Sequence, residues 1–104
     1  MESLEKKEQL NQLFDLYAQL LTDKQALYFE HYYREDYSLQ EIAELYQVSR
    51  NAVYDQLRTV EDHLISYEEK LHLFKMQETR KKIIDEAILK QDLSLLKDLR
   101  KLDE

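Results

Sequence analysis

The chain contains no glycine, no proline and no cysteine among its 104 residues. Hairpin turns of two residues depend on positive φ, which glycine supplies most readily, so antiparallel sheets are disfavoured. Proline, the strongest interruption of a helix, is absent, and the helix formers Leu, Glu, Lys and Gln are abundant. We therefore expect an all-α fold. The lack of cysteine excludes disulfides, thiol nucleophiles and zinc–thiolate sites.

The sequence also lacks an apolar run of the length that a signal peptide or a membrane span requires. We therefore expect a cytoplasmic protein without membrane insertion. His31, His63 and His72 show no metal-ligand spacing, and no nucleophile stands in a legible pattern with a base. No enzymatic activity, metal or cofactor is expected.

Basic residues are fewer than acidic ones, and the formal net charge is −7. Residues 1–37 carry four Lys/Arg against eight Asp/Glu, residues 38–64 carry two against five, and residues 65–104 carry nine against nine. Non-specific affinity for DNA comes mostly from Lys and Arg that neutralise phosphates. The charge distribution therefore argues against strong non-specific DNA binding by the middle of the chain.

The stretch from Ser38 to Leu64 has the pattern of a helix-turn-helix. Ser38 and Glu41 form a capping box that starts a short helix, and Ser49 caps a second helix. The second helix of such a motif usually enters the major groove of DNA. The helical pattern upstream predicts one helix from about Ser3 to Leu20 and another over 23–34, started by Thr22 with Gln25.

An apolar heptad extends the second motif helix beyond the motif. Its members recur at alternating intervals of four and three: Val53, Leu57, Val60, Leu64, Tyr67, Leu71 and Phe74. This spacing predicts one helix of about seven turns, reaching Lys75. We expect its near half to pack on the chain's own helices. That near half runs from Val53 to Leu64. The candidate seam of a homodimer begins at its last residue and consists of Leu64, Tyr67, Leu71 and Phe74, with the C-terminal helices as the alternative cover of the far half.

The remaining residues predict a helix over Glu78–Lys90 and a last short helix marked by Leu93, Leu96, Leu99 and Leu102. The predicted division is a helix-turn-helix domain at 1–64, winged-helix-like and of the sigma region-four type, and an extended helical region at 65–104. The second region is expected to serve dimerisation and docking.

Five side chains of the second motif helix point away from its apolar face: Arg50, Asn51, Tyr54, Asp55 and Arg58. Arg can pair with guanine and Asn with adenine through two hydrogen bonds, and Tyr54 and Arg58 could reach phosphates. Asp55 would repel the DNA backbone unless its carboxylate accepts a hydrogen bond from a cytosine amine or orients Arg58. The alternative is a solvated face on which Asp55 and Arg58 form an i, i+3 pair.

The motif resembles region four of bacterial sigma factors at Ser38, the EIAE run from Glu41 to Glu44, Val48-Ser49, Val53 and Leu57. Gln47 stands where the turn normally has glycine, so we expect a left-handed non-glycine residue there. Tyr54 and Gln56 replace basic residues that sigma domains commonly offer to DNA.

A more specific resemblance rests on LFDLY, LLTDKQ, YYREDYSLQEIAE, VSRNAVYDQL and YEEKLHLFK, which occur in order over residues 13–75. These motifs resemble the YlxM family of small bacterial helix-turn-helix proteins. The resemblance implies a sigma-region-four-like fold and no catalytic residues. It also implies a link to the signal recognition particle, since the family's gene commonly lies beside that of the particle's GTPase.

Two functions therefore remain open. In the first, the protein is a dimeric DNA-binding regulator. In the second, it is an accessory factor that binds protein or RNA components of the signal recognition particle, and its acidic motif is a scaffold.

Overall fold

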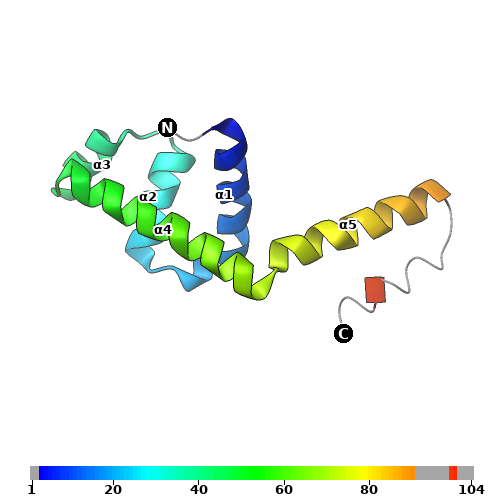
Figure 1. Cartoon of the computed structure of the whole chain (residues 1–104). Coiled ribbons are helices and arrows are strands. Elements are labelled where there is room, and N and C mark those ends of the chain that lie inside the picture. The colour runs from blue at the N-terminus through cyan, green and yellow to red at the C-terminus, as the bar shows by residue number, and fades with distance from the viewer. Residues whose placement is uncertain (1–2, 91–98, 101–104) are drawn as a thin grey trace. The chain divides into compact units, whose positions relative to one another are not determined.

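The computed structural model describes residues 3–90 and 99–100. Its helices in chain order are α1 (Leu4–Tyr17), the short 3₁₀ helix η1 (Ala18–Leu20), α2 (Asp23–Tyr33), α3 (Leu39–Tyr46), α4 (Arg50–Leu71) and α5 (Leu73–Lys90) (Figure 1). The predicted all-α class is confirmed. The wing of a winged-helix domain is a β-hairpin. The described part of the chain has no strand, so the winged-helix-like part of the prediction is not seen there.

The chain divides into two compact units, Met1–Lys70 and Leu71–Glu104. The boundary expected after Leu64 therefore falls inside α4. Within residues 3–90 and 99–100, no helix is long and apolar enough to cross a membrane. Of the predicted last helix, only Leu99 and Arg100 belong to the described residues.

Both predicted capping boxes are present. The Gln25 backbone N–H donates to the Thr22 hydroxyl at 3.1 Å, and the Thr22 N–H donates to the Gln25 side chain at 3.1 Å. Ser38 and Glu41 make the equivalent pair at 3.0 Å in each direction. These bonds satisfy backbone donors that have no partner inside the helix, which fixes where α2 and α3 begin.

The turn of the helix-turn-helix is made by Gln47, whose φ of 55° and ψ of 46° are left-handed, as predicted. The Val48 N–H reaches back to the carbonyl of Ala43 at 3.0 Å, the hydrogen bond of a Schellman-type helix end. On the other side, the Ala52 N–H donates to the Ser49 hydroxyl at 3.0 Å and starts α4. The left-handed Gln47 and these two local hydrogen bonds thus define the motif.

The first unit closes around two groups of apolar side chains. Beneath the motif, the buried cluster consists of Tyr28, Ile42, Ala43, Val53 and Leu57. Between α1 and α2, Phe14 stacks on Phe29 with ring centroids 4.3 Å apart. Val53, Leu57, Val60 and Leu64 are all buried, so the near half of the heptad packs on the chain's own helices as predicted. Tyr28 of α2 is fully buried in this core.

Two helices end earlier than predicted. α1 stops at Tyr17, and residues 18–20 tighten into η1. The prediction of one continuous helix of seven turns is wrong. His72 has a left-handed φ of 55°, and α4 ends before it, at Leu71. The His72 carbonyl then accepts from the Met76 N–H at 2.9 Å, so the same residue begins α5. Histidine is among the few non-glycine residues that are enriched in this conformation, but periodicity carries no sign of it.

Candidate nucleic-acid interface

All five predicted DNA-reading residues, Arg50, Asn51, Tyr54, Asp55 and Arg58, are exposed on the first three turns of α4. The residues between them that point inward, Val53 and Leu57, are buried against α2 and α3. The packing of the motif therefore fixes which side of α4 faces outward. This arrangement presents Arg50 and Asn51 at the start of the helix, the end that reads bases in most helix-turn-helix proteins.

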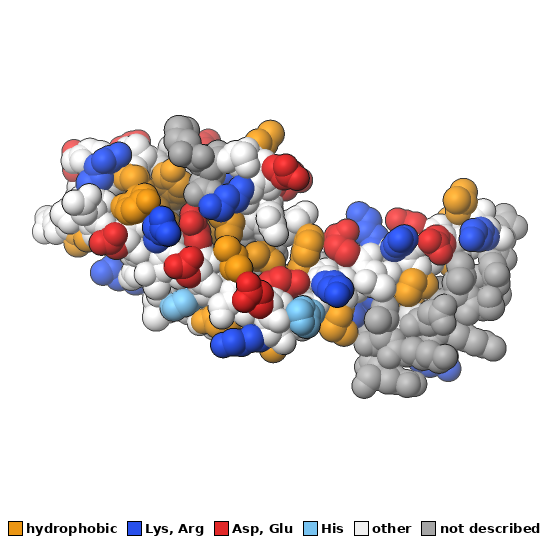
Figure 2. Space-filling view, in the orientation of Figure 1, with side chains coloured by type: hydrophobic (Ala, Val, Ile, Leu, Met, Phe, Trp, Pro, Cys, Tyr) orange, Lys and Arg blue, Asp and Glu red, His pale blue; other side chains and the backbone are white. Residues whose placement is uncertain are grey.

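An open groove of about 760 Å³ runs along this side of α4. It is lined by four of the five candidates, by further residues of α4, and by residues of α1, α2 and the start of α3: Lys6, Tyr32, Tyr33, Ser38, Leu39, Arg50, Asn51, Tyr54, Leu57, Arg58, Glu61, Asp62 and Ile65. Asp55 is not among them. In Figure 2, apolar side chains and charges of both signs are interspersed on this face. We call this feature the α1–α4 groove.

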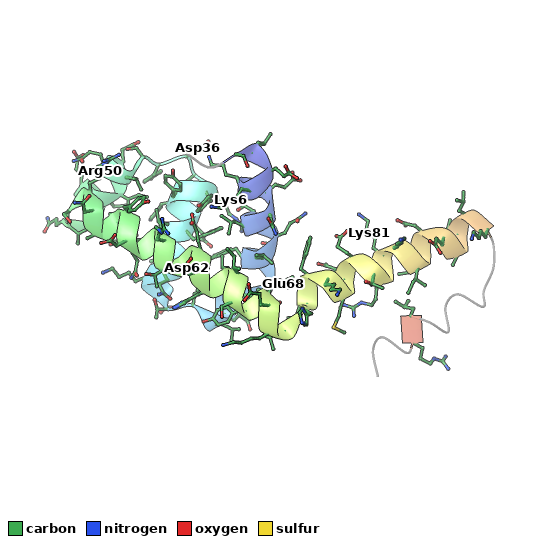
Figure 3. All side chains as sticks on the ribbon, viewed as in Figure 1. Lys6, Asp36, Arg50, Asp62, Glu68 and Lys81 are labelled. Atoms are coloured by element: carbon green, nitrogen blue, oxygen red, sulfur yellow. The ribbon has the colours of Figure 1, made fainter. Side chains whose placement is uncertain are left out.

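The α1–α4 groove includes a basic residue that the motif does not contain. Lys6, in the first turns of α1, lines the groove together with Arg50 and Arg58 of α4. In Figure 3, Lys6 and Arg50 are labelled on the two helices that border it. Next to Lys6, the Lys7 ammonium lies 5.9 Å from the centroid of the Tyr32 ring, another groove residue. Sequence reasoning missed both lysines because their place depends on how α1 packs across the motif.

The pKa of Arg58 is raised by side chains that lie one turn away on α4. A hydrogen bond with the Tyr54 side chain, and then the negative charges of Asp62 and Glu61, raise the pKa of Arg58 above its ordinary value. No ion pair joins Asp55 to Arg58 in the described structure, so the i, i+3 pair of the alternative interpretation is not formed there. Arg58 therefore stays cationic at neutral pH.

Acidic side chains occupy the end of the groove farther along α4. Asp62 is exposed, and Glu61 accepts a hydrogen bond from the Tyr33 hydroxyl of α2. These carboxylates repel phosphates, whereas Arg50 and Arg58 attract them. The groove is therefore polarised along its length, and a polyanion is expected to favour the end nearer the motif turn.

The four seam candidates differ in burial. Leu64 is fully buried within the first unit. Tyr67 is half-buried and contacts upstream residues: its hydroxyl donates to the Leu20 carbonyl at 3.3 Å, and its ring centroid lies 5.9 Å from that of Tyr17. Leu71 is 48% exposed, and Phe74 is half-buried in the second unit. The dimer seam therefore stays a prediction.

Among the described side chains, no group of three or more His, Asp or Glu residues is placed to hold a metal ion. His31 and His63 serve local packing instead, the first against Tyr37 at 4.9 Å and the second against Tyr67 at 6.0 Å between ring centroids.

Comparison with known proteins gives a consistent result. Residues 4–103 match the family described as "Putative helix-turn-helix protein, YlxM / p13 like", UPF0122. A UPF0122 protein of Lactococcus lactis subsp. cremoris is 46% identical over 97% of this chain and 96% of its own length. One from Oceanobacillus iheyensis is 55% identical over 83% of this chain and 82% of its own. One from Bacillus licheniformis is 50% identical over 97% of this chain and 99% of its own.

Proposed function

The chain belongs to the YlxM/p13-like helix-turn-helix family, and on that premise we propose that it is a DNA-binding regulatory protein. Arg50 and Asn51 read base edges in the major groove, and Tyr54 and Arg58 hold the adjacent phosphates. The observation that carries this proposal is the α1–α4 groove. Four candidate residues line it together, exposed and on one side of a helix whose other side is buried.

The proposal is tested by selecting duplexes from a random pool and comparing the selected site with a scrambled duplex by fluorescence anisotropy. Asn51→Ala should cost about 1–3 kcal/mol on the selected site and almost nothing on the scrambled one, because a base contact carries sequence information. Thr59→Ala, an exposed change on α4 outside the groove, is the matched control. Failure to bind selected or own-operon DNA even at low salt would overturn the proposal.

We further propose that the regulator acts as a homodimer through its second unit. Support comes from apolar side chains left exposed in and next to α5, which include Leu71, Ile88 and Leu89 at 48%, 71% and 83%. Exposed apolar groups on a helix are typical of a surface that another helix covers. Two copies would place two motifs on two half-sites.

A specific feature favours a second candidate function, docking to the signal recognition particle. Residues 3–70 carry seven Lys/Arg against fourteen Asp/Glu, a surplus suited to basic protein partners. If this function holds, purified particle GTPase with its RNA should retain the protein at modest salt. Release of the complex at high salt would then be expected, since the attraction is screened.

A further inference from the structure

The helix-turn-helix of this chain has few of its own positive charges. The segment from Ser38 to Leu64 contains two basic residues, Arg50 and Arg58, against five acidic ones. A helix-turn-helix that binds DNA takes much of its affinity from phosphate contacts, each of which requires a cation or another strong donor. Those contacts must therefore come partly from outside the motif.

The first turns of α1 lie where such contacts are needed. Lys6 lines the α1–α4 groove across from α4, although 44 positions separate it from Arg50 in the chain. Lys6 raises the number of basic residues that line the groove from two to three, and Lys7, the next residue of α1, packs on the groove residue Tyr32. A phosphate backbone that follows the groove would meet cations on both of its walls.

Lys7 is also restrained. Its ammonium lies 5.9 Å from the Tyr32 ring centroid, within the range of a cation–π interaction, and its side chain is half-buried. Because a lysine that is already partly ordered loses less conformational entropy on binding, a given phosphate contact becomes more favourable. The Tyr32 ring in turn forms part of the groove wall.

We propose that Lys6 and Lys7 of α1 form a second phosphate-binding wall, which holds the DNA backbone opposite the reading helix α4. The inference rests on the proposed DNA-binding function and deepens it. Arg50 and Asn51 choose the sequence, whereas Lys6 and Lys7 contribute affinity that does not depend on sequence. The protein's contact with DNA is thereby wider than its motif.

The test is the salt dependence of duplex binding by the full chain. The probe is a fluorescent duplex from the selection experiment, titrated by anisotropy at several NaCl concentrations. The slope of log K against log salt is negative, and each lost phosphate contact reduces its magnitude by about 0.9. The double variant Lys6→Gln with Lys7→Gln should therefore reduce the magnitude by about 1.8. The loss should be equal for selected and scrambled duplexes.

Lys24→Gln supplies a closely matched control. The Lys24 ammonium also lies over a tyrosine ring, 5.6 Å from the centroid of Tyr28, but Tyr28, unlike Tyr32, is not part of the groove wall. Its slope should equal that of the wild type, and thermal melting should show all variants folded. An unchanged slope in the Lys6, Lys7 variant, with wild-type binding intact, would overturn the second wall alone.

Two other outcomes have separate meanings. Absence of any binding by the wild-type protein would overturn the DNA-binding function itself, and the second wall with it. Tighter binding of an RNA duplex of the same sequence would overturn the assignment of the groove to DNA, because A-form RNA presents its phosphates differently.

Discussion

The Nε2 atom of His31 lies 2.8 Å from the Tyr46 hydroxyl, a contact that joins the end of α2 to the end of α3. The same imidazole stacks on Tyr37 and places its Nδ1 atom 3.3 Å from a Glu35 carboxylate oxygen. Helices α2 and α3 are thus tied together by polar and aromatic contacts near the motif turn. The position of α4 relative to α2 and α3 depends on this junction as well as on the buried apolar cluster.

Tyr46→Phe tests the strength of the junction. Removing the hydroxyl leaves His31 without this partner and should lower the free energy of unfolding by about 1 kcal/mol, the net value of a hydrogen bond. Desolvation, and then the neighbouring Tyr28, Glu35 and Tyr37, raise the pKa of Tyr46, so the hydroxyl stays protonated at neutral pH. Urea unfolding at pH 7 measures the change. Tyr32→Phe removes the same hydroxyl from a residue of a different helix, α2, and should leave the free energy of unfolding almost unchanged. Equal losses in both variants would contradict the prediction.

The capping box at α3 predicts a pH dependence. Hydrogen bonds from Ser38, first its backbone N–H and then its side chain, lower the pKa of Glu41 below its ordinary value. A carboxyl whose folded pKa is depressed contributes stability above the unfolded pKa and loses it as the pH falls through the folded pKa. Between about pH 5 and pH 3 the wild type should therefore lose more stability than Glu41→Gln, which does not titrate. Glu44→Gln, in the same helix but outside the box, should follow the wild type.

Ser38→Ala removes the other half of the box and should destabilise the protein by about 1 kcal/mol at pH 7. The Glu41 N–H then loses its acceptor, the Ser38 hydroxyl at 3.0 Å. Urea unfolding measures the loss, and Ser49→Ala, the cap of α4, should cost a similar amount. No change in either variant would show that water replaces these caps without loss.

The left-handed turn residue predicts a stabilising change. A non-glycine residue in this conformation costs about 1–2 kcal/mol, a cost that glycine avoids. Glycine also has more conformational freedom in the unfolded chain, and this offsets part of the gain in stability. Gln47→Gly should therefore stabilise the protein by about 1 kcal/mol in chemical unfolding. The same substitution at exposed Gln12, inside α1, should instead destabilise by about 1 kcal/mol. Destabilisation at both positions would contradict this account of the turn.

These local features were predictable because each depends on residues within a few positions. The capping boxes at Thr22 and Ser38 and the left-handed Gln47 follow from side-chain chemistry and from the spacing of the motif. The position of Lys6 beside α4 was not predictable, since it depends on how three helices pack. Nor was the break at His72, because the heptad continues through it in the sequence. Tyr67 shows the same limit: its spacing fits a seam, yet its hydroxyl binds the Leu20 carbonyl.

Leu64 and Leu71 separate folding from self-association. Leu64 is fully buried, so Leu64→Ala should cost about 2–5 kcal/mol of folding free energy. Leu71 is 48% exposed, so Leu71→Ala should leave the unfolding of the first unit almost unchanged and weaken the proposed homodimer. Thermal melting and sedimentation equilibrium measure the two effects. If Leu71→Ala left both the mass in solution and the melting temperature unchanged, Leu71 would have no part in a dimer seam.

The acidic end of the α1–α4 groove predicts a gain in DNA affinity. Asp62 lines the groove and is exposed, and its charge contributes to the raised pKa of Arg58. A negative charge near a phosphate costs about 1 kcal/mol at 4 Å in water, so Asp62→Asn should strengthen duplex binding about two- to fivefold at low salt.

The gain should shrink as salt rises, because ions screen the repulsion. It should also be equal on selected and scrambled duplexes, since Asp62 lies beyond Arg50 and Asn51, the proposed base-reading residues at the start of α4. Asp23→Asn, an exposed aspartate at the start of α2 that does not line the groove, controls for the change in net charge. A gain in both variants would indicate a general charge effect. Weaker binding by Asp62→Asn alone would mean that Asp62 orients Arg58 for its phosphate contact, and the acidic end of the groove would then assist binding.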